Sequence, residues 1–209
     1  MTVQLDRWTG DFGDQYTQRN IVDWRDRVGA WWSILKGLNF EPGDSEDVDY
    51  LEIGCNRGHN LRAIQVMEGR SVAGIEPNRV ALLEASSLVL DDDIDVFPDV
   101  ESWESRSRQE RCAQLVFTCG VLIHIPPDEL DATLRKIHAL SRKYVLCIEY
   151  FADQETAVEY RGFTDMLWKR NWPHEYESRF PELKLIRSGF WGKDAGFDDV
   201  NWWLWEKNR

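Results

Sequence analysis

The sequence predicts a single α/β domain built around a mostly parallel sheet, and three observations carry this prediction. Short apolar runs alternate with longer segments whose apolar residues recur every three or four positions, as in strands followed by amphipathic helices. The run at 143–150 has almost no polar alternation, which is typical of a strand covered on both faces. With 209 residues, 43% of them hydrophobic, the chain can bury one substantial core. We therefore expect residues 1–209 to form one domain.

The N-terminal part, residues 1–45, is expected to supply a lid and a helix. Its first 20 residues are polar and carry Gly10 and Gly13 between aromatic side chains, which indicates a segment that orders over a ligand. From Arg19 the pattern changes to steps of three and four residues, which predicts an amphipathic helix. The apolar face of this helix, expected in the core, consists of Ile21, Trp24, Val28, Trp31 and Leu35.

Residues 48–151 are expected to form five parallel strands joined by right-handed crossovers. The strands are predicted at 50–55, 71–77, 94–98, 113–120 and 143–150, and the third has the weakest pattern. Helical spacing follows at 61–67, from 78 to about 90, and from 126 to 140. The segment 101–111 is polar and predicts no defined element.

The last third of the chain is less regular. Residues 152–182 are expected to form an irregular helical insert. Residues 183–209 contain two apolar runs joined by a short loop rich in Gly and Asp, which predicts a hairpin. The hairpin would add an antiparallel C-terminal strand at the edge of the sheet.

Composition excludes several classes of function. The 25 Lys and Arg residues against 37 Asp and Glu residues give a net charge of −12, which repels nucleic acid. No run reaches the roughly 18 apolar residues of a membrane span, and the N-terminus has no apolar leader. The four cysteines include no C-x-x-C pair and no histidine at zinc spacing. We expect a cytoplasmic protein with no metal, no nucleic acid partner and no membrane partner.

The most informative segment is Y-L-E-I-G-C-N-R-G, residues 50–58, where a strand enters a glycine turn and then a helix. Glu52, Gly54, Asn56 and Gly58 fit the acidic-x-G-x-G-x-G pattern of an S-adenosylmethionine site, with Asn in place of the middle glycine. Glu76, 18 residues past Gly58, ends the second strand, where a carboxylate accepts hydrogen bonds from ribose hydroxyls. A dinucleotide site and a strand-turn-helix without a ligand remain as alternatives, although the G-x-G-x-x-G spacing is missing.

A resemblance to a known family covers the chain from about residue 8 to its C-terminus. The chain resembles the pseudaminic-acid-biosynthesis-associated methylases, a branch of the class I S-adenosylmethionine-dependent methyltransferases. The resemblance implies a Rossmann-like fold with a seven-stranded sheet and helices on both faces. It rests on FGDQYTQRN (12–20), YLEIGCNRGHNLRAI (50–64), GIEPN (74–78), VFTCGVLIHIPPDEL (116–130), YVLCIEYF (144–151), EYRG (159–162), LWKR (167–170) and DVNWWLWEK (199–207).

Carried over by position, the resemblance assigns the donor site, with S-adenosylhomocysteine as the product. It implies that Glu52, Gly54, Asn56 and Gly58 surround the methionine end of the donor and that Glu76 holds the ribose. The further donor residues that it implies are Pro77, Asn78 and Asp99 near the adenine, Thr118, Cys119 and Gly120 under the sulfonium, and Tyr16 and Arg19 over the carboxylate.

The acceptor side follows from the position of polar residues near strand ends. His124 is a candidate general base, and Glu149 and Tyr150 end the fifth strand, where open α/β sheets bind ligands. Candidate acceptor-binding residues in the insert are Tyr160, Arg161, Lys169, Arg170 and His174.

We expect methyl transfer to a small polar acceptor such as a sugar acid. The clustering of cations in the insert of an acidic chain predicts that this acceptor is an anion, held by Arg161 or Arg170. Two alternatives stay open: a methyltransferase that acts on protein or RNA, and a protein that binds the donor without turnover.

Overall fold

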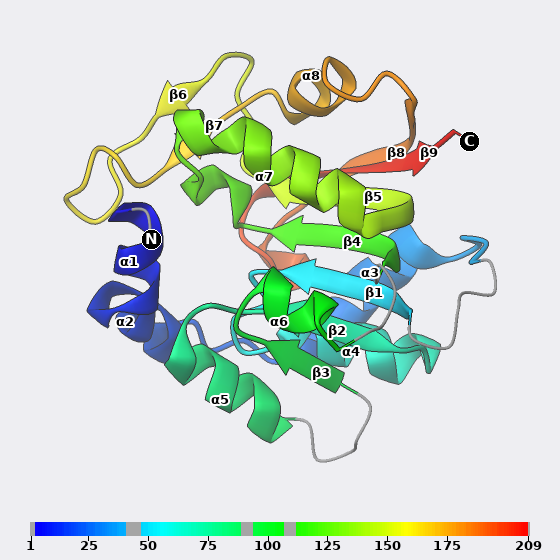
Figure 1. Cartoon of the computed structure of the whole chain (residues 1–209), viewed down its shortest axis with the longest axis horizontal. Coiled ribbons are helices and arrows are strands. Elements are labelled where there is room, and N and C mark those ends of the chain that lie inside the picture. Colours follow the sequence, from blue (N-terminus) through cyan, green and yellow to red (C-terminus); the bar gives the residue numbers. More distant parts are fainter. Residues whose placement is uncertain (1–2, 41–46, 89–93, 107–111, 209) are drawn as a thin grey trace.

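A seven-stranded sheet organises the protein (Figure 1). The computed structural model describes residues 3–40, 47–88, 94–106 and 112–208. The strand order is β3-β2-β1-β4-β5-β9-β8, in which neighbours from β3 to β5 are parallel and β9 is antiparallel to both β5 and β8. The strands are β1 Val48–Ile53, β2 Val72–Ile75, β3 Ile94–Phe97, β4 Ala113–Cys119, β5 Ser141–Glu149, β8 Leu183–Trp191 and β9 Val200–Lys207.

The predicted α/β fold is therefore confirmed, including the antiparallel C-terminal strand. Within the C-terminal hairpin, β9 pairs with β5 and lies inside the sheet, while β8 forms the edge. The apolar side chains of β9 explain this place. Trp203 and Trp205 join the core on one face, and Trp202 and Leu204 join the core on the other. A strand that is buried on both faces gains more as an inner strand than at an edge.

Helices cover both faces of the sheet. On one face α6 (Val100–Glu104), α7 (Pro127–Leu140) and α8 (Trp172–Glu177) bury Trp103, Leu134 and Trp172. On the other face α3 (Val28–Leu35) and α4 (His59–Glu68) bury Trp31 and Ile64. A further helix, α5 (Arg79–Leu88), follows β2. The order of the strands reverses between β1 and β4, so the carboxyl ends of these two strands form the edge at which such sheets bind ligands.

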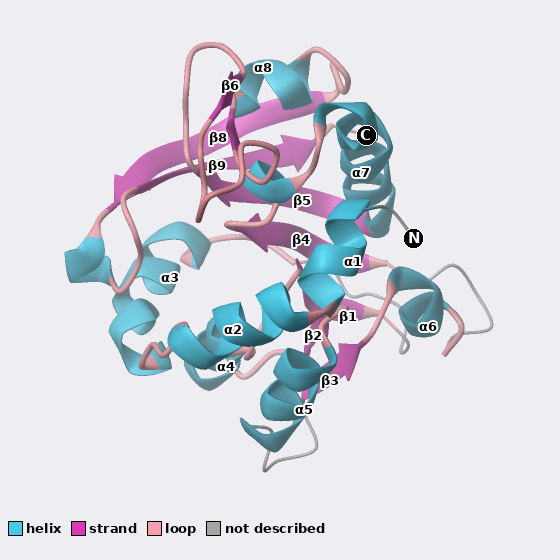
Figure 2. Ribbon diagram, turned by 90° about the vertical axis from the view of Figure 1, so that its left-hand side faces the viewer, coloured by secondary structure: helices cyan, strands magenta, loops and turns pink. Residues whose placement is uncertain are grey.

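The N-terminal residues form two short helices that lie across the carboxyl ends of the strands (Figure 2). They are α1 (Val3–Thr9) and α2 (Asp11–Arg19), and we refer to residues 3–19 as the N-terminal cover. The helix predicted from Arg19 is wrong in its first part. A 3-10 turn, η1 (Trp24–Arg27), leads into α3, and Ile21 is 77% exposed.

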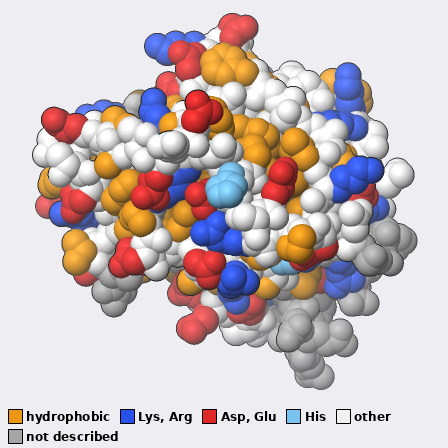
Figure 3. Space-filling view, turned by 90° about the horizontal axis from the view of Figure 1, so that it is seen from above, with side chains coloured by type: hydrophobic (Ala, Val, Ile, Leu, Met, Phe, Trp, Pro, Cys, Tyr) orange, Lys and Arg blue, Asp and Glu red, His pale blue; other side chains and the backbone are white. Residues whose placement is uncertain are grey.

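The predicted helical insert is mostly irregular and contains little helix. It contains a small two-stranded sheet of β6 (Thr156–Ala157) and β7 (Trp168–Lys169), followed by the single short helix α8. A second 3-10 turn, η2 (Leu122–His124), follows β4, and a third, η3 (Lys193–Ala195), connects β8 to β9. The space-filling view from above shows acidic, basic and apolar side chains intermixed on that face (Figure 3). In the described residues no helix combines the length and the apolar character that a membrane crossing requires.

Candidate active site

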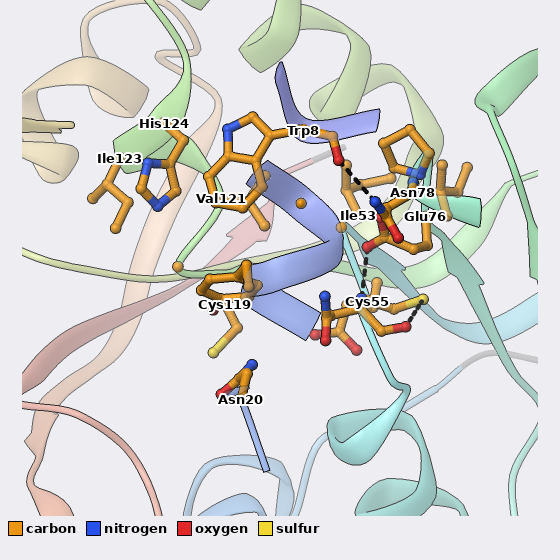
Figure 4. Close-up of a pocket in the computed structure, with 18 of the residues that line it drawn as sticks. Trp8, Asn20, Ile53, Cys55, Glu76, Asn78, Cys119, Val121, Ile123 and His124 are labelled. Atoms are coloured by element: carbon orange, nitrogen blue, oxygen red, sulfur yellow. Dashed lines mark hydrogen bonds between the residues drawn. The ribbon is translucent and has the colours of Figure 1, made fainter. Parts of the chain in front are cut away.

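A cavity of about 540 Å³ lies at the carboxyl ends of the parallel strands, beneath the N-terminal cover. Its lining combines residues that are far apart in the sequence, from the cover, from the turns after β1, β2 and β4, and from the end of β5. Figure 4 shows Trp8, Glu76, Cys119 and His124 arranged around this space. The position matches the ligand-binding edge that the strand order defines.

The turn after β1 forms part of the cavity wall, and its backbone requires small or turn-forming residues. Gly54 has a φ of +74°, and a Cβ atom there would lie 2.5 Å from a methyl carbon of Val121. Gly58 has a φ of +73°. Asn56, which stands where the pattern has its middle glycine, has a φ of 45°. Asn tolerates this left-handed conformation better than other residues with a side chain, which explains how the departure from the pattern is accommodated.

Glu76 lies in the cavity with both carboxylate oxygens held by backbone N–H groups. The N–H of Asn56 donates to one oxygen and the N–H of Asn78 donates to the other, each at 2.7 Å. The side chain is only 6% exposed, and this burial raises the pKa of Glu76 against the opposing effect of the two hydrogen bonds. Each carboxylate oxygen can accept a further hydrogen bond, so Glu76 is a fixed double acceptor.

Asn78 joins this site to the N-terminal cover. Its amide nitrogen donates to the carbonyl oxygen of Trp8 at 3.0 Å and to the carboxylate of Asp14 at 2.8 Å, while its amide oxygen caps α5 through the N–H of Ala81. Asn56 makes a similar connection, because its amide nitrogen lies 3.0 Å from the hydroxyl of Thr17. The side chains predicted to contact the donor therefore also hold the cover in place.

Glu52, Asn60 and Arg27 form a buried polar group at the bottom of the cavity. Asn60 donates to one oxygen of Glu52 at 2.7 Å and accepts from Arg27 at 2.8 Å, while the other oxygen of Glu52 has no hydrogen-bond partner. Burial raises the pKa of Glu52 to about 8. Arg27 also donates to the carbonyl of Gly196 and lies 4.4 Å from the ring centre of Phe197. An unpaired acid and a fixed cation thus face the same space.

His124 faces the cavity from η2 and contacts the ring of Trp8, with the ring centres 4.6 Å apart (Figure 4). Its Nδ1 lies 2.6 Å from the carbonyl oxygen of Met166, which can only accept, so Nδ1 carries the proton. Burial lowers the pKa of His124 to about 4. The imidazole is therefore neutral at pH 7, and Nε2 is left as a hydrogen-bond acceptor.

Glu149 and Arg170 hold the turn that carries His124, residues 121–125. Glu149 is fully buried and accepts hydrogen bonds from three successive N–H groups, those of residues 121–123. Burial nevertheless raises the pKa of Glu149 to about 7. Arg170 is also fully buried and donates to the carbonyl oxygens of Leu122 and Ile125, with its third contact to the carboxylate of Glu155. Both side chains position this turn, and neither lines the cavity.

The structure brings most of the predicted site residues to the cavity, but not all. Those that line it are Tyr16, Glu52, Gly54, Asn56, Glu76, Pro77, Asn78, Asp99, Cys119, Gly120, His124, Tyr150 and Tyr160. Those that do not are Arg19, Gly58, Thr118, Glu149, Arg161, Lys169, Arg170 and His174.

The residues outside the cavity have evident reasons for their positions. Arg19 is exposed and lies over the rings of Phe12 and Tyr16, and Thr118 is buried within β4. Arg161 and His174 are exposed, while Lys169 lies 5.6 Å from the ring centre of Tyr150. The expectation that Arg170 holds an anionic acceptor is wrong in physical terms, because its guanidinium is enclosed by protein and bound to Glu155 and two carbonyls.

Among the cavity residues that sequence reasoning missed are Arg27, Asn60 and Trp8. Arg27 lies on the polar side of an amphipathic pattern, and Asn60 lies in the first turn of a helix, so neither position indicated a cavity residue. Trp8 was interpreted only as one aromatic residue of the predicted lid. The N-terminal segment did carry a signal, since its closely spaced aromatic residues suggested a segment ordered by contact with the rest of the chain. Among the described residues, no three His, Cys, Asp or Glu side chains gather as a metal ion would require.

Comparisons with solved structures define the class of fold. No family model matches the chain, and no curated protein sequence matches it significantly. The protein has the fold of the class I S-adenosylmethionine-dependent methyltransferases. A methyltransferase of this kind from Anabaena variabilis superposes with a TM-score of 0.70 at 14% identity, covering 100% of this chain and 96% of that one.

Two further structures of particular enzymes show the same fold. Magnesium protoporphyrin IX methyltransferase from Synechocystis PCC 6803, with S-adenosylmethionine bound, gives a TM-score of 0.65 at 15% identity and covers 100% of this chain and 99% of that chain. The 1,6-didemethyltoxoflavin-N1-methyltransferase of Burkholderia thailandensis, with its substrate and S-adenosylhomocysteine bound, gives 0.65 at 16% identity, with 99% and 88% covered.

Proposed function

We propose that this protein is an enzyme that transfers a methyl group from S-adenosylmethionine to a small molecule. The observation that carries the proposal is the fixed carboxylate of Glu76, which meets the glycine turn after β1 in one cavity at the reversal of strand order. Structural neighbours with this fold include enzymes crystallised with S-adenosylmethionine or S-adenosylhomocysteine. The resemblance to the pseudaminic-acid-associated branch remains a finer hypothesis about the pathway.

The residues present fit the donor part by part. The donor's amino acid end carries an ammonium and a carboxylate, which complement the unpaired oxygen of Glu52 and the guanidinium of Arg27. Its ribose has two hydroxyls, which match the two free acceptor positions of Glu76. We assign Pro77, Asn78 and Asp99 to the adenine side, since all three line the cavity and follow the neighbouring strands β2 and β3.

S-adenosylmethionine supplies a methyl group activated by a positive sulfur; the acceptor atom bonds to the methyl carbon, and the electron pair of the broken S–C bond stays on sulfur. The protein mainly has to hold the acceptor in line at about 3–3.5 Å. His124, with a free Nε2 facing the cavity, is placed to take a proton from a hydroxyl acceptor. The N-terminal cover would exclude water from this space, which supports our proposal that the N-terminal part, residues 1–45, supplies a lid and a helix.

The alternatives are not favoured by a specific observation. A protein or RNA substrate would need an open groove, whereas the cavity lies beneath the N-terminal cover. A donor-binding protein without turnover would not need a neutral histidine with a free nitrogen inside the cavity. The division of the chain into 48–151 for the donor, 152–182 for the acceptor and 183–209 as a hairpin is part of the same proposal. That the protein is cytoplasmic and without a nucleic acid partner also remains a prediction.

The decisive experiment is calorimetric titration of the purified protein with S-adenosylhomocysteine, with NAD as the matched control. We expect binding of S-adenosylhomocysteine and none of NAD, because the cavity offers no G-x-G-x-x-G turn for a pyrophosphate. Binding of NAD alone would reverse the proposal. Incubation with labelled S-adenosylmethionine and a panel of small hydroxyl compounds and amines then tests turnover, and binding without transfer to any member would favour the protein without turnover.

A further inference from the structure

The charged side chains that line the cavity restrict which acceptor can bind. The inference drawn from them rests on the proposed function. Arg27 and Arg57 are the Lys or Arg residues that line the cavity in the described part of the chain. Both are engaged, Arg27 with Asn60 and Gly196 and Arg57 with Glu84, and both belong to the end that we assign to the donor. The carboxylates that line the cavity are Glu52, Glu76, Asp99, Glu129 and Asp198. Burial keeps Glu52 protonated near pH 7, but the other four carboxyl groups still outnumber the two arginines, and this excess opposes a second anion beside the donor.

The side chains around His124 in the cavity are aromatic and aliphatic. The ring of His124 lies between two other aromatic rings, with ring centres 4.6 Å from Trp8 and 5.3 Å from Tyr160. Ile123, Ile125 and Leu167 also line the cavity. Flat aromatic and aliphatic walls favour a planar apolar ligand and penalise a charged one, because a buried charge without a partner loses its hydration.

Two side-chain nitrogens near these rings can form hydrogen bonds with a ligand, Nε2 of His124 and Nε1 of Trp8. Nε2 of His124 accepts, as its Nδ1 is committed to the carbonyl of Met166. The indole N–H of Trp8 is buried and has no hydrogen-bond partner among the described residues. A ligand that supplies a hydroxyl proton to His124 and an oxygen to Trp8 would satisfy both groups, whereas an apolar ligand would leave the buried indole N–H unpaired.

We propose that the methyl acceptor is an uncharged aromatic hydroxyl compound, bound against the aromatic and aliphatic side chains around His124 with its hydroxyl donating to Nε2 of His124. This replaces the sugar acid expected from the cations of the insert. In that insert Arg170 forms an ion pair with Glu155. Arg179 forms ion pairs with Asp131 and Glu175. Specificity would then come from ring stacking and one hydroxyl contact.

The test compares two ligands of the same ring system, 2-naphthol, which is uncharged at pH 7, and 2-naphthoate, which is an anion. Each is titrated by calorimetry into the protein saturated with S-adenosylhomocysteine. We expect 2-naphthol to bind at least about tenfold more tightly than 2-naphthoate. Equal binding, tighter binding of the anion, or no binding of 2-naphthol would overturn the inference. Failure to bind S-adenosylhomocysteine would instead refute the proposed function, so the two failures are distinguishable.

Two variants locate the binding site. Trp8→Phe keeps a ring but removes the N–H, and His124→Asn retains an amide near the position of Nδ1 for Met166 while removing Nε2. Each should weaken 2-naphthol binding about fivefold or more and leave S-adenosylhomocysteine affinity within twofold. Trp32→Phe, at a side chain that is 54% exposed on α3 and does not line the cavity, is the matched control and should change neither affinity. Unchanged 2-naphthol binding in both cavity variants would refute the placement of the ligand.

Discussion

Glu52 should lower the stability of the folded protein while it strengthens binding of the donor. The substitution Glu52→Gln measures both effects. The carboxyl is 1% exposed, one of its oxygens has no partner, and burial raises its pKa from 4.5 to about 8. Gln has the same shape and can still accept the hydrogen bond from Asn60. The substitution therefore removes the titration of this group while keeping its main contact.

The magnitude follows from the pKa values of the folded and unfolded chains. Between pH 4.5 and pH 8 the unfolded carboxyl is ionised while the folded one keeps its proton. The folded wild-type protein therefore loses about 1.4 kcal/mol of stability per pH unit in this window relative to the variant. At pH 7 the full linkage amounts to about 3 kcal/mol, and we expect Glu52→Gln to be more stable by about 1–3 kcal/mol. Near pH 4 the two proteins should be equally stable.

Thermal unfolding at pH 4, 5.5, 7 and 8 provides the assay. For a chain of this length 1 kcal/mol corresponds to a shift of about 2–4 °C, so the midpoint should rise by several degrees at pH 7 and not at pH 4. The exposed residue Glu159 provides the matched control, because Glu159→Gln should show no such pH-dependent gain. The same Glu52→Gln protein should bind S-adenosylhomocysteine at least about tenfold more weakly, because the bound ammonium favours the ionised form of Glu52 and Gln cannot ionise. A variant that is no more stable at pH 7, or whose advantage does not grow with pH, would refute the reasoning.

Four further predictions concern the cavity. Glu76→Ala should weaken S-adenosylhomocysteine binding by about 1.5–3 kcal/mol in calorimetry, and unchanged affinity in a folded variant would remove Glu76 from the site. Arg27→Met should lower the same affinity about tenfold or more, while Arg19→Met, at an exposed position outside the cavity, should not. Deleting residues 1–18 should leave cooperative unfolding intact but reduce donor affinity, because five lining residues of the cover are lost; full affinity would mean that the segment is only a tail. Binding of 2-naphthol should be constant from pH 8 to about pH 5.5 and fall only toward the pKa of about 4 of His124, whereas loss near pH 6.5 would indicate an ordinary histidine.

The sheet and the part of the cavity formed by the turns after β1 and β2 were predictable because their signals are local. A strand covered on both faces shows its burial in its own sequence, as 143–150 does. The turn at Gly54 and the carboxylate of Glu76 each follow directly from a strand end, so spacing along the chain fixes their positions at one edge of the sheet. Even the departure at Asn56 is explained by one residue's tolerance for a left-handed backbone.

The N-terminal cover was not predictable as two helices, because its stability does not come from its own sequence. Helices of seven and nine residues are too short to form alone in water, so they depend on tertiary contacts. Those contacts are distant in sequence. Gln4 donates to the carbonyl oxygen of His124, and Asn78 donates to the carbonyl oxygen of Trp8. The position of Arg27 in the cavity could not be predicted for the same reason, because only tertiary contacts bring η1 to the cavity.

The acceptor side shows why a count of charges cannot assign a ligand. A guanidinium has five donors, and the folded protein can use them on its own carbonyl oxygens. Arg170 donates to the carbonyl oxygens of Leu122 and Ile125. Glu149 accepts from three N–H groups of the same turn. A basic side chain therefore holds the carbonyl groups of this turn, and an acidic side chain holds its N–H groups. Removing Glu149 would leave three N–H groups of this turn without their acceptor, removing Arg170 would leave two carbonyl oxygens without their donor, and either change would release the turn that positions His124. In our proposal Arg170, the cation that the sequence suggested for substrate binding, therefore affects catalysis only through the backbone that carries His124, and recognition of the acceptor depends on uncharged rings.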